Sequence, residues 1–215
     1  MQAVVARGGV RSLADGVLFA ALALWLASVA VGFGLLWRYK STPGAQARSL
    51  ERRWPAASHI PRDPDRATLL MFVHPRCPCT RASVAELSRL MGRLSPRVAA
   101  RVVFVRPQGV EEDWERGELW THASSIPGTA PVLDAGGTEA ERFGARTSGQ
   151  VLLYDAAGRL AFSGGLTASR GHEGDSFGQR RIVSLVETGS ADRADSPVFG
   201  CALGASLQLP EKEER

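Results

Sequence analysis

Residues 68–80 read Thr68-Leu-Leu-Met-Phe-Val-His-Pro-Arg-Cys-Pro-Cys-Thr80, and this stretch determines the fold class. Residues 68–73 form a continuous apolar run, the pattern of a central strand that is buried on both faces. After the turn, apolar residues recur at spacings of one to three from Ala82 to Leu94, which predicts an amphipathic helix that Ser95-Pro96 ends. A buried strand that passes directly into a helix indicates an α/β domain.

The elements that follow alternate between strands and helices. We expect a strand at 98–105, a helix at 111–124, a short strand or extended turn at 131–133, a short helix at 139–143, two strands at 150–154 and 159–163, and a last helix at 175–186. The two strands flank Asp155-Ala-Ala-Gly158, a turn typical of a hairpin. Asp175 or Ser176 is the expected N-cap of the last helix. The order predicts a small α/β sheet with an added antiparallel hairpin.

An uncharged apolar run precedes this domain. Residues 16–37 contain no charge over 22 positions, and Asp15 and Arg38 bound them. As a helix the run is roughly 33 Å long, enough to span a bilayer. The alternative is a cleaved signal peptide, whose apolar region is usually shorter and ends at small residues, whereas this run ends in Leu35-Leu36-Trp37. We therefore predict an uncleaved transmembrane helix.

Composition and charge limit the classes of function. The chain is 44% hydrophobic and 22% charged, which is typical of globular proteins, and its three cysteines are too few for a disulfide scaffold. Residues 1–60 hold seven Lys and Arg against two Asp and Glu, whereas residues 61–215 hold 19 against 20. The basic part therefore lies beside the membrane, where it can meet anionic lipid headgroups, and the near-neutral domain predicts no nucleic-acid partner.

We expect five consecutive parts along the chain. They are a short N-terminal tail at 1–15, the transmembrane helix at 16–37, a linker with Pro and Arg at 38–66, the α/β domain at 67–190, and a C-terminal tail at 191–215 that contains Cys201. Within the linker, Trp54 is expected to dock onto the domain.

Cys77-Pro78-Cys79 lies between the buried strand and the helix. Pro78 suits the first helical position, which makes Cys77 the N-cap, close to unpaired backbone N–H groups and the positive end of the helix dipole. A thiolate is stabilised there, so we expect Cys77 to have a lowered pKa and to act as a nucleophile in disulfide exchange. Arg76 and Arg81 would add positive potential. The alternative is a pair of structural cysteines that happen to flank a proline.

This element resembles the active-site turn of thioredoxins, in which a Phe-rich strand runs into Cys-x-x-Cys. Phe72 stands five residues before Cys77, which takes the nucleophile position. Thr80 takes the place of the second thioredoxin cysteine, and Cys79 comes one residue early. The resemblance implies an α/β thioredoxin-like domain, a central mixed sheet flanked by helices, behind one N-terminal transmembrane helix.

A second stretch, residues 143–154, resembles the thioredoxin segment that leads through a cis-proline into a strand. Gly149 stands where that proline is expected, and we expect the glycine to leave the site more open. The motifs at 74–83, 147–154 and 169–175 (Ser-Arg-Gly-His-Glu-Gly-Asp) are similar to those of membrane-anchored bacterial proteins labelled RedB. This resemblance extends from about Trp54 to Cys201.

The sequence leaves two candidates, Cys79 and Cys201, for the cysteine that forms a disulfide with Cys77. A Cys77–Cys79 disulfide would close a tight, strained ring, which makes it more oxidising. Cys201 would resolve Cys77, pair with another protein, or be a buried bystander.

Three polar residues are candidates to support the cysteines. His74, at the end of the strand, would tune the thiolate, bind a metal, or serve only as a turn residue. His172 and Glu173 lie in the glycine-flanked loop 169–175, from which they would supply a base or orient the site, or simply form a polar loop before the last helix.

The leading hypothesis is a membrane-tethered thiol–disulfide oxidoreductase that needs no cofactor. An alternative is a copper-binding or metallochaperone module, because Cu(I) is a soft metal that prefers thiolates; its ligands would be Cys77, Cys79, His74 and His172. A third hypothesis is a non-catalytic thioredoxin-like scaffold. A lone-cysteine peroxidase is disfavoured, because peroxiredoxin-like sites carry threonine where this chain has His74.

The expected partners are membrane lipid, through residues 16–37, and a protein thiol or disulfide. Positive charge is denser after the apolar run than before it, which by itself places the domain in the cytoplasm. Tethered thioredoxin-like domains mostly act on the oxidising side of the bacterial inner membrane, so the resemblance implies a single-pass inner-membrane protein with a periplasmic domain.

Overall fold

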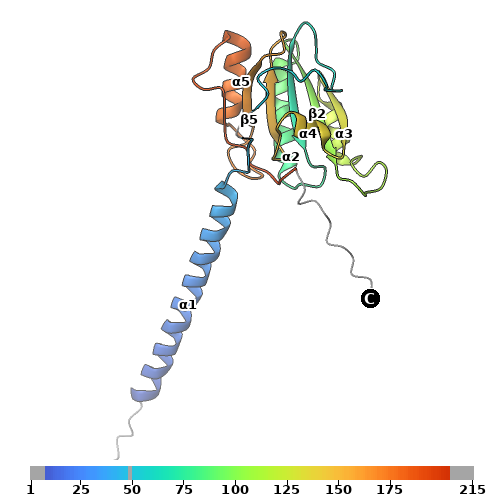
Figure 1. Ribbon diagram of the computed structural model, residues 1–215. Coiled ribbons are helices and arrows are strands. Elements are labelled where there is room, and N and C mark those ends of the chain that lie inside the picture. The colour runs from blue at the N-terminus through green and yellow to red at the C-terminus, as the bar shows by residue number, and fades with distance from the viewer. Residues whose placement is uncertain (1–7, 48–49, 204–215) are drawn as a thin grey trace, which may run out of the picture. The chain divides into compact units, whose positions relative to one another are not determined.

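The computed structural model describes residues 8–47 and 50–203, and contacts within the chain divide it into two units, Met1–Lys40 and Ser41–Arg215 (Figure 1). The first unit contains all but the last residue of the helix α1, Gly8–Ser41. Its part Asp15–Ser41 has 27 residues with a mean hydropathy of 2.2, and none of it is buried. By length and composition α1 can cross a membrane, a property that membrane anchors share with signal sequences.

The predicted span 16–37 lies inside α1, but the helix is longer at both ends. Residues from Gly8 onward, expected to form a tail, are helical; residues 1–7 lie outside the described part of the chain. Arg38 and Lys40 do not end the helix, because cations in the last turn interact favourably with its dipole. It ends at Ser41, just before Thr42-Pro43, where the proline disfavours helical backbone in the residue before it.

The second unit is built on a five-stranded mixed sheet with the strand order β3-β2-β1-β4-β5. The strands are β1 (Ala67–Val73), β2 (Val98–Arg106), β3 (Thr129–Ala135), β4 (Gln150–Tyr154) and β5 (Leu160–Gly165). β1, β2 and β3 are parallel, whereas β4 is antiparallel to both β1 and β5. The predicted α/β sheet with an antiparallel hairpin is confirmed.

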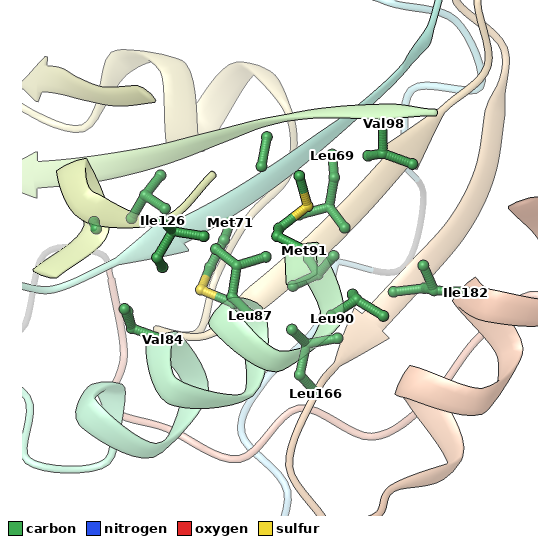
Figure 2. Close-up of a cluster of buried hydrophobic side chains, with 14 of the residues drawn as sticks. Leu69, Met71, Val84, Leu87, Leu90, Met91, Val98, Ile126, Leu166 and Ile182 are labelled. Atoms are coloured by element: carbon green, nitrogen blue, oxygen red, sulfur yellow. The ribbon is translucent and has the colours of Figure 1, made fainter. Parts of the chain in front are cut away.

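Helices cover both faces of the sheet (Figure 1). They are α2 (Thr80–Leu94), α3 (Glu118–Ser125), α4 (Thr138–Arg142) and α5 (Phe177–Thr188). Alternate residues of β1 belong to different cores: Leu69 and Met71 pack with α2, α3 and α5, whereas Phe72 packs on the other face. Figure 2 shows the first of these cores, in which Leu87 and Met91 of α2 lie close to the strands.

The segment before β1 covers the second face of the sheet. Residues 50–66 were expected to belong to a linker, but Ile60 is buried there, and the Trp54 ring lies 5.1 Å from Phe143 and 5.2 Å from Tyr154. The Leu160 N–H also donates a hydrogen bond to the carbonyl of Arg52. These residues pack because their apolar side chains close a core that α4, with five residues, is too short to cover.

The chain after α5 also departs from the predicted tail at 191–215. Its described part, up to residue 203, returns to the domain: Asp195 bridges to Ser163 of β5, and Ala202 bridges to Thr147. Val198 and Leu203 are buried, and they hold this segment in place.

Two helix starts differ from the expected ones. α3 begins at Glu118 rather than at residue 111, because residues 111–117 form turns in which Asp113 has a φ of 65°, outside the helical region. α5 begins after Ser176, whose side chain accepts a hydrogen bond from the Gln179 N–H, as expected for an N-cap.

Candidate functional site

The turn between β1 and α2 holds two of the three cysteines. The Cys77 N–H donates to the His74 carbonyl (3.1 Å), and the Thr80 N–H donates to the Cys77 carbonyl (3.0 Å). α2 begins at Thr80 with Cys79 as its N-cap, so the expectation that Cys77 is the N-cap and Pro78 the first helical residue is wrong. Residues 74–80 instead form two successive hydrogen-bonded turns before the helix starts. Pro78 is exposed between two buried cysteines.

Cys201 lies directly beside Cys77. Their Sγ atoms are 2.7 Å apart, although 124 residues separate them in the chain. Cys77 and Cys79 are 4% and 8% exposed, Cys201 is partly buried, and all three are free thiols. Of the three alternatives for Cys201, this position is compatible with the exchange reaction with Cys77, because only a small shift separates the two sulfurs from a disulfide bond.

Backbone pairing carries Cys201 to this position. Residues 146–148, just before β4, lie antiparallel to residues 201–203, with a bridge between Thr147 and Ala202. The Ser148 N–H donates to the Cys201 carbonyl (2.7 Å), and the Leu203 N–H donates to the Arg146 carbonyl (2.9 Å). Cys201 is thus presented on an extended segment rather than on a helix or a loop tip.

Hydrogen bonds set the protonation state of Cys77. Burial alone raises the pKa of its thiol, but side-chain hydrogen bonds from Cys201 and Thr80 and backbone hydrogen bonds from Cys201 and Cys79 outweigh burial. The net effect lowers the pKa of Cys77. The Cys77 thiolate is therefore stabilised mainly by these hydrogen bonds, and not by capping of a helix as the sequence predicted.

The other two thiols hold their protons more tightly. Burial, the hydrogen bond to Cys77 and the charge on Cys77 raise the pKa of Cys201 to about 12. Burial and the charge on Cys77 raise the pKa of Cys79. Arg170 opposes both shifts. Of the three thiols, Cys77 therefore ionises most readily, with Cys201 as the S–H donor.

Arg170 is a site residue that sequence reasoning missed. It lies between β5 and α5, and its guanidinium donates to the Gly200 carbonyl, next to Cys201. Arg76 and Arg81, the expected sources of positive potential, are occupied elsewhere: Arg76 stacks over Trp114 at 4.5 Å, and Arg81 pairs with Glu118. The motif at 169–175 contains Arg170, but no local spacing relates it to the cysteines.

Thr80 and Ser148 link the turn to the segment before β4. Their hydroxyl oxygens are 2.7 Å apart, and the Ser148 hydroxyl accepts from the His74 backbone N–H (2.8 Å). Both residues are buried. This polar connection fixes Thr80, the residue in the position of the second thioredoxin cysteine, within reach of Cys77.

His74 is buried, and its ring faces Trp114 edge-on with the centroids 5.4 Å apart. Burial and then the charge of Arg76 lower its pKa, so its imidazole is neutral at neutral pH. Its buried Nε2 has no hydrogen-bond partner among the described residues. His74 therefore contributes its backbone to the site, through the hydrogen bonds to Cys77 and Ser148.

His172 and Glu173 lie in an exposed loop. Glu173 pairs with Arg89 of α2 (2.7 Å). The loop is held by the buried Glu86, whose carboxylate accepts from the Gly174 N–H and the Gln179 amide, both at 2.6 Å. His172 and Glu173 thus lie at the protein surface, in this loop.

The ligand set expected for Cu(I) is not assembled. Within residues 8–47 and 50–203, no group of three or more His, Cys, Asp or Glu side chains is arranged to hold a metal ion. One reason is visible in the fold: His172 is exposed, whereas Cys77, Cys79 and His74 are buried.

Gly149 has a φ of +88°, and its N–H donates to the Phe72 carbonyl (2.8 Å). A Cβ at this position would lie 2.7 Å from the Ser83 Oγ. The expectation that glycine leaves the site more open is therefore wrong: the space is filled by Ser83 and by the carbonyl of Phe199, on the segment that carries Cys201. Glycine is needed for the left-handed backbone.

No protein-family model and no curated protein matches the sequence. Solved structures do. A hypothetical protein of Sinorhizobium meliloti is similar over 74% of this chain and 97% of its own, with 20% identity and a TM-score of 0.57. An uncharacterized conserved protein of Geobacillus kaustophilus is similar over 79% and 95%, with 18% identity and a TM-score of 0.55.

These structures are similar to this chain in overall fold over about three quarters of its length. The domain has a thioredoxin-like fold. A weaker likeness, with a TM-score of 0.39 and 17% identity, is to a secreted disulfide oxidoreductase of Mycobacterium tuberculosis over 56% of this chain and 80% of that one. In this thioredoxin-like domain the cysteine cluster lies at the carboxyl end of β1, the central strand.

Proposed function

We propose that the protein is a membrane-tethered thiol–disulfide oxidoreductase in which Cys77 is the nucleophile and Cys201 resolves it. The observation that carries the proposal is the 2.7 Å separation of the two sulfurs. The lowered pKa of Cys77 supports the assignment of the nucleophile, because the thiolate is the form that attacks a disulfide. The resemblance of the Cys77 turn to the thioredoxin active-site turn supports the same chemistry.

The reaction proceeds by two exchanges. The Cys77 thiolate attacks one sulfur of a partner disulfide, forms a mixed disulfide, and releases the other partner sulfur, which takes up a proton. Cys201 then gives up its proton and attacks the Cys77 sulfur, which forms the Cys77–Cys201 disulfide and releases the second partner thiol. The partner gains two electrons, which the cysteine pair loses. In reverse, the same steps oxidise a partner dithiol.

Charge coupling gives this sequence its order. Burial raises the pKa of Cys201, and while Cys77 is a thiolate two further causes raise it more, the hydrogen bond to Cys77 and the charge on Cys77. Both causes vanish once Cys77 is part of a mixed disulfide, because the sulfur is then neutral. Arg170 remains, and it lowers the pKa of Cys201. Cys201 therefore becomes a better nucleophile at the step at which it must attack.

Alkylation as a function of pH tests the nucleophile. Because its pKa is lowered, Cys77 should react with iodoacetamide with a midpoint below that of an ordinary cysteine. Replacing Cys201 with alanine removes the S–H donor and should raise this midpoint by about 1–2 pH units, the value of a hydrogen bond to a charged group. Peptide mass spectrometry identifies the modified cysteine.

Cys79→Ala is the matched control for that experiment. Cys79 supports the Cys77 thiolate through its backbone N–H, which alanine keeps, and through a smaller contribution from its side chain, so the midpoint should rise less than in Cys201→Ala. A wild-type midpoint at or above that of free cysteine would contradict the proposal. So would a Cys201→Ala midpoint equal to that of the wild type.

We further propose that α1 anchors the protein in the bacterial inner membrane and that the domain faces the periplasm. An oxidising compartment is where disulfide chemistry persists, which supports this side despite the positive charges that follow the apolar run. A reporter fused to the C-terminus should be active if it requires export. Activity confined to a reporter that works only in the cytoplasm would reverse the orientation.

A further inference from the structure

The extended segment Gly200–Leu203 binds the domain chiefly through its backbone. Three hydrogen bonds hold its main chain: the Ser148 N–H donates to the Cys201 carbonyl, the Leu203 N–H donates to the Arg146 carbonyl, and the Arg170 guanidinium donates to the Gly200 carbonyl. All three use main-chain groups of the segment, which every polypeptide carries. These contacts would therefore hold any extended chain that places a cysteine at the position of Cys201.

Gly200 allows the segment to lie very close to the backbone of Ser148. A Cβ at this position would lie 1.9 Å from the Ser148 carbonyl oxygen and 2.9 Å from its carbon, so another residue cannot occupy it without moving the segment away from the domain. The residue before the cysteine must therefore be glycine for the pairing to form. At the other end, Leu203 is buried, whereas Ala202 between them is exposed.

This segment also closes access to Cys77. The nucleophile is 4% exposed, and Cys201 already occupies the position next to its sulfur. A partner sulfur has to reach Cys77 for exchange to begin, and it cannot share that position with Cys201.

We propose that Gly200–Leu203 is an internal partner strand, which occupies the edge at Arg146–Ser148 where an extended Gly-Cys segment of the redox partner binds, and which that segment must displace. This inference rests on the proposed function. The incoming segment makes the same backbone contacts, with its glycine against Ser148 and its carbonyl on Arg170. Its cysteine, as part of a disulfide, is attacked by Cys77, and the sulfur released from that disulfide leaves as a thiol. The internal strand then returns to the edge, which brings Cys201 back to the Cys77 sulfur for the second exchange.

Two full-length variants in detergent test the competition. Cys201→Ser removes the internal thiol and keeps the strand; Cys201→Ser with Gly200→Val also displaces the strand, because valine adds the Cβ that Ser148 cannot accept. The probe is a synthetic peptide with the sequence Ser-Pro-Val-Phe-Gly-Cys-Ala-Leu of residues 196–203, activated at its cysteine as a thionitrobenzoate disulfide. The rate of thionitrobenzoate release reports the attack by Cys77.

The double variant should react with this peptide about tenfold faster, because the edge no longer has to be vacated first. A peptide with Ala in place of its Gly should lose most of this gain. Equal rates for the two peptides, or no acceleration by Gly200→Val, would overturn the inference. Ala202→Val in the Cys201→Ser background is the matched control: the position is exposed, so the strand stays and the rate should not change.

Two further measurements keep the outcome decisive. Thermal unfolding shows whether Gly200→Val keeps the domain folded; if it does not, Leu203→Ser replaces it, because this change weakens the buried end of the strand without altering its backbone. The reaction of the double variant, in which the strand is displaced, with a small thionitrobenzoate disulfide that needs no docking edge separates the two proposals. If Cys77 reacts with it no faster than free cysteine does, the proposed function fails; if it reacts fast but cannot distinguish the peptides, only the internal strand is wrong.

Discussion

The Cys201→Ser variant should accumulate a mixed disulfide between Cys77 and its partner that the wild type resolves. Cys77 keeps its nucleophilic sulfur, so the first exchange proceeds, but the serine hydroxyl cannot perform the second. In the wild type the Cys201 sulfur lies 2.7 Å from that of Cys77, and well-placed intramolecular groups act at very high effective concentration. We expect the lifetime of the mixed disulfide to increase at least about 100-fold. This factor is only a small fraction of the rate advantage that a well-placed intramolecular group can give.

Glutathione disulfide is a suitable probe, and the adduct is measured by intact-protein mass spectrometry after rapid acid quenching. Cys79→Ser is the control, and it should release glutathione at the wild-type rate because Cys201 remains. The reverse pattern, trapping by Cys79→Ser and release by Cys201→Ser, would assign the resolving role to Cys79. Cys77→Ser should form no adduct with glutathione at the cluster.

Replacing Gly149 with proline, the residue that thioredoxins carry at this position, should destabilise the domain by about 3 kcal/mol or more. Gly149 has a φ of +88°, whereas proline is restricted to about −65°. Proline would also remove the N–H that donates to the Phe72 carbonyl, and its ring would meet the Ser83 hydroxyl. Chemical denaturation of Gly149→Pro, followed by circular dichroism, measures the loss in the free energy of unfolding.

Gly109→Ala is the control for left-handed backbone without close packing. Gly109 has a φ of +76°, but a Cβ there meets nothing within 4 Å, so alanine should cost only about 1–2 kcal/mol. If Gly149→Pro were as stable as the wild type, this loop could adopt the cis-proline form of thioredoxins, and the filled site described above would be wrong.

Local pattern was sufficient for most of the fold. The apolar run of β1, the amphipathic pattern of α2 and the turn before β5 each depend on neighbours in the chain, and each element lies where the sequence predicts it. The errors occur where packing overrides pattern. Residues 50–66 and 191–203 look like connecting segments because their few apolar residues have no periodicity, yet Ile60 and Val198 are buried.

The candidate site divides in the same way. Cys77 and Cys79 were found from a motif within a few residues, whereas Arg170 and Ser148 were not, because each lies far along the chain and no local spacing relates it to the cysteines. Helix capping predicted a lowered pKa for Cys77, and the direction is right, but the groups that lower it are the Cys201 and Thr80 side chains together with backbone N–H groups.

By itself the sequence determined an N-terminal apolar helix, the order of strands and helices, and a pair of cysteines in the turn after the first strand, since hydrophobic periodicity and turn chemistry are local properties. Only the tertiary structure decided which cysteine faces Cys77. Cys201 comes from 124 residues away and reaches the site because Gly200 lets its backbone lie against Ser148. Pairing between distant extended segments depends on the packing of the whole sheet, and the spacing of residues along the chain does not encode it.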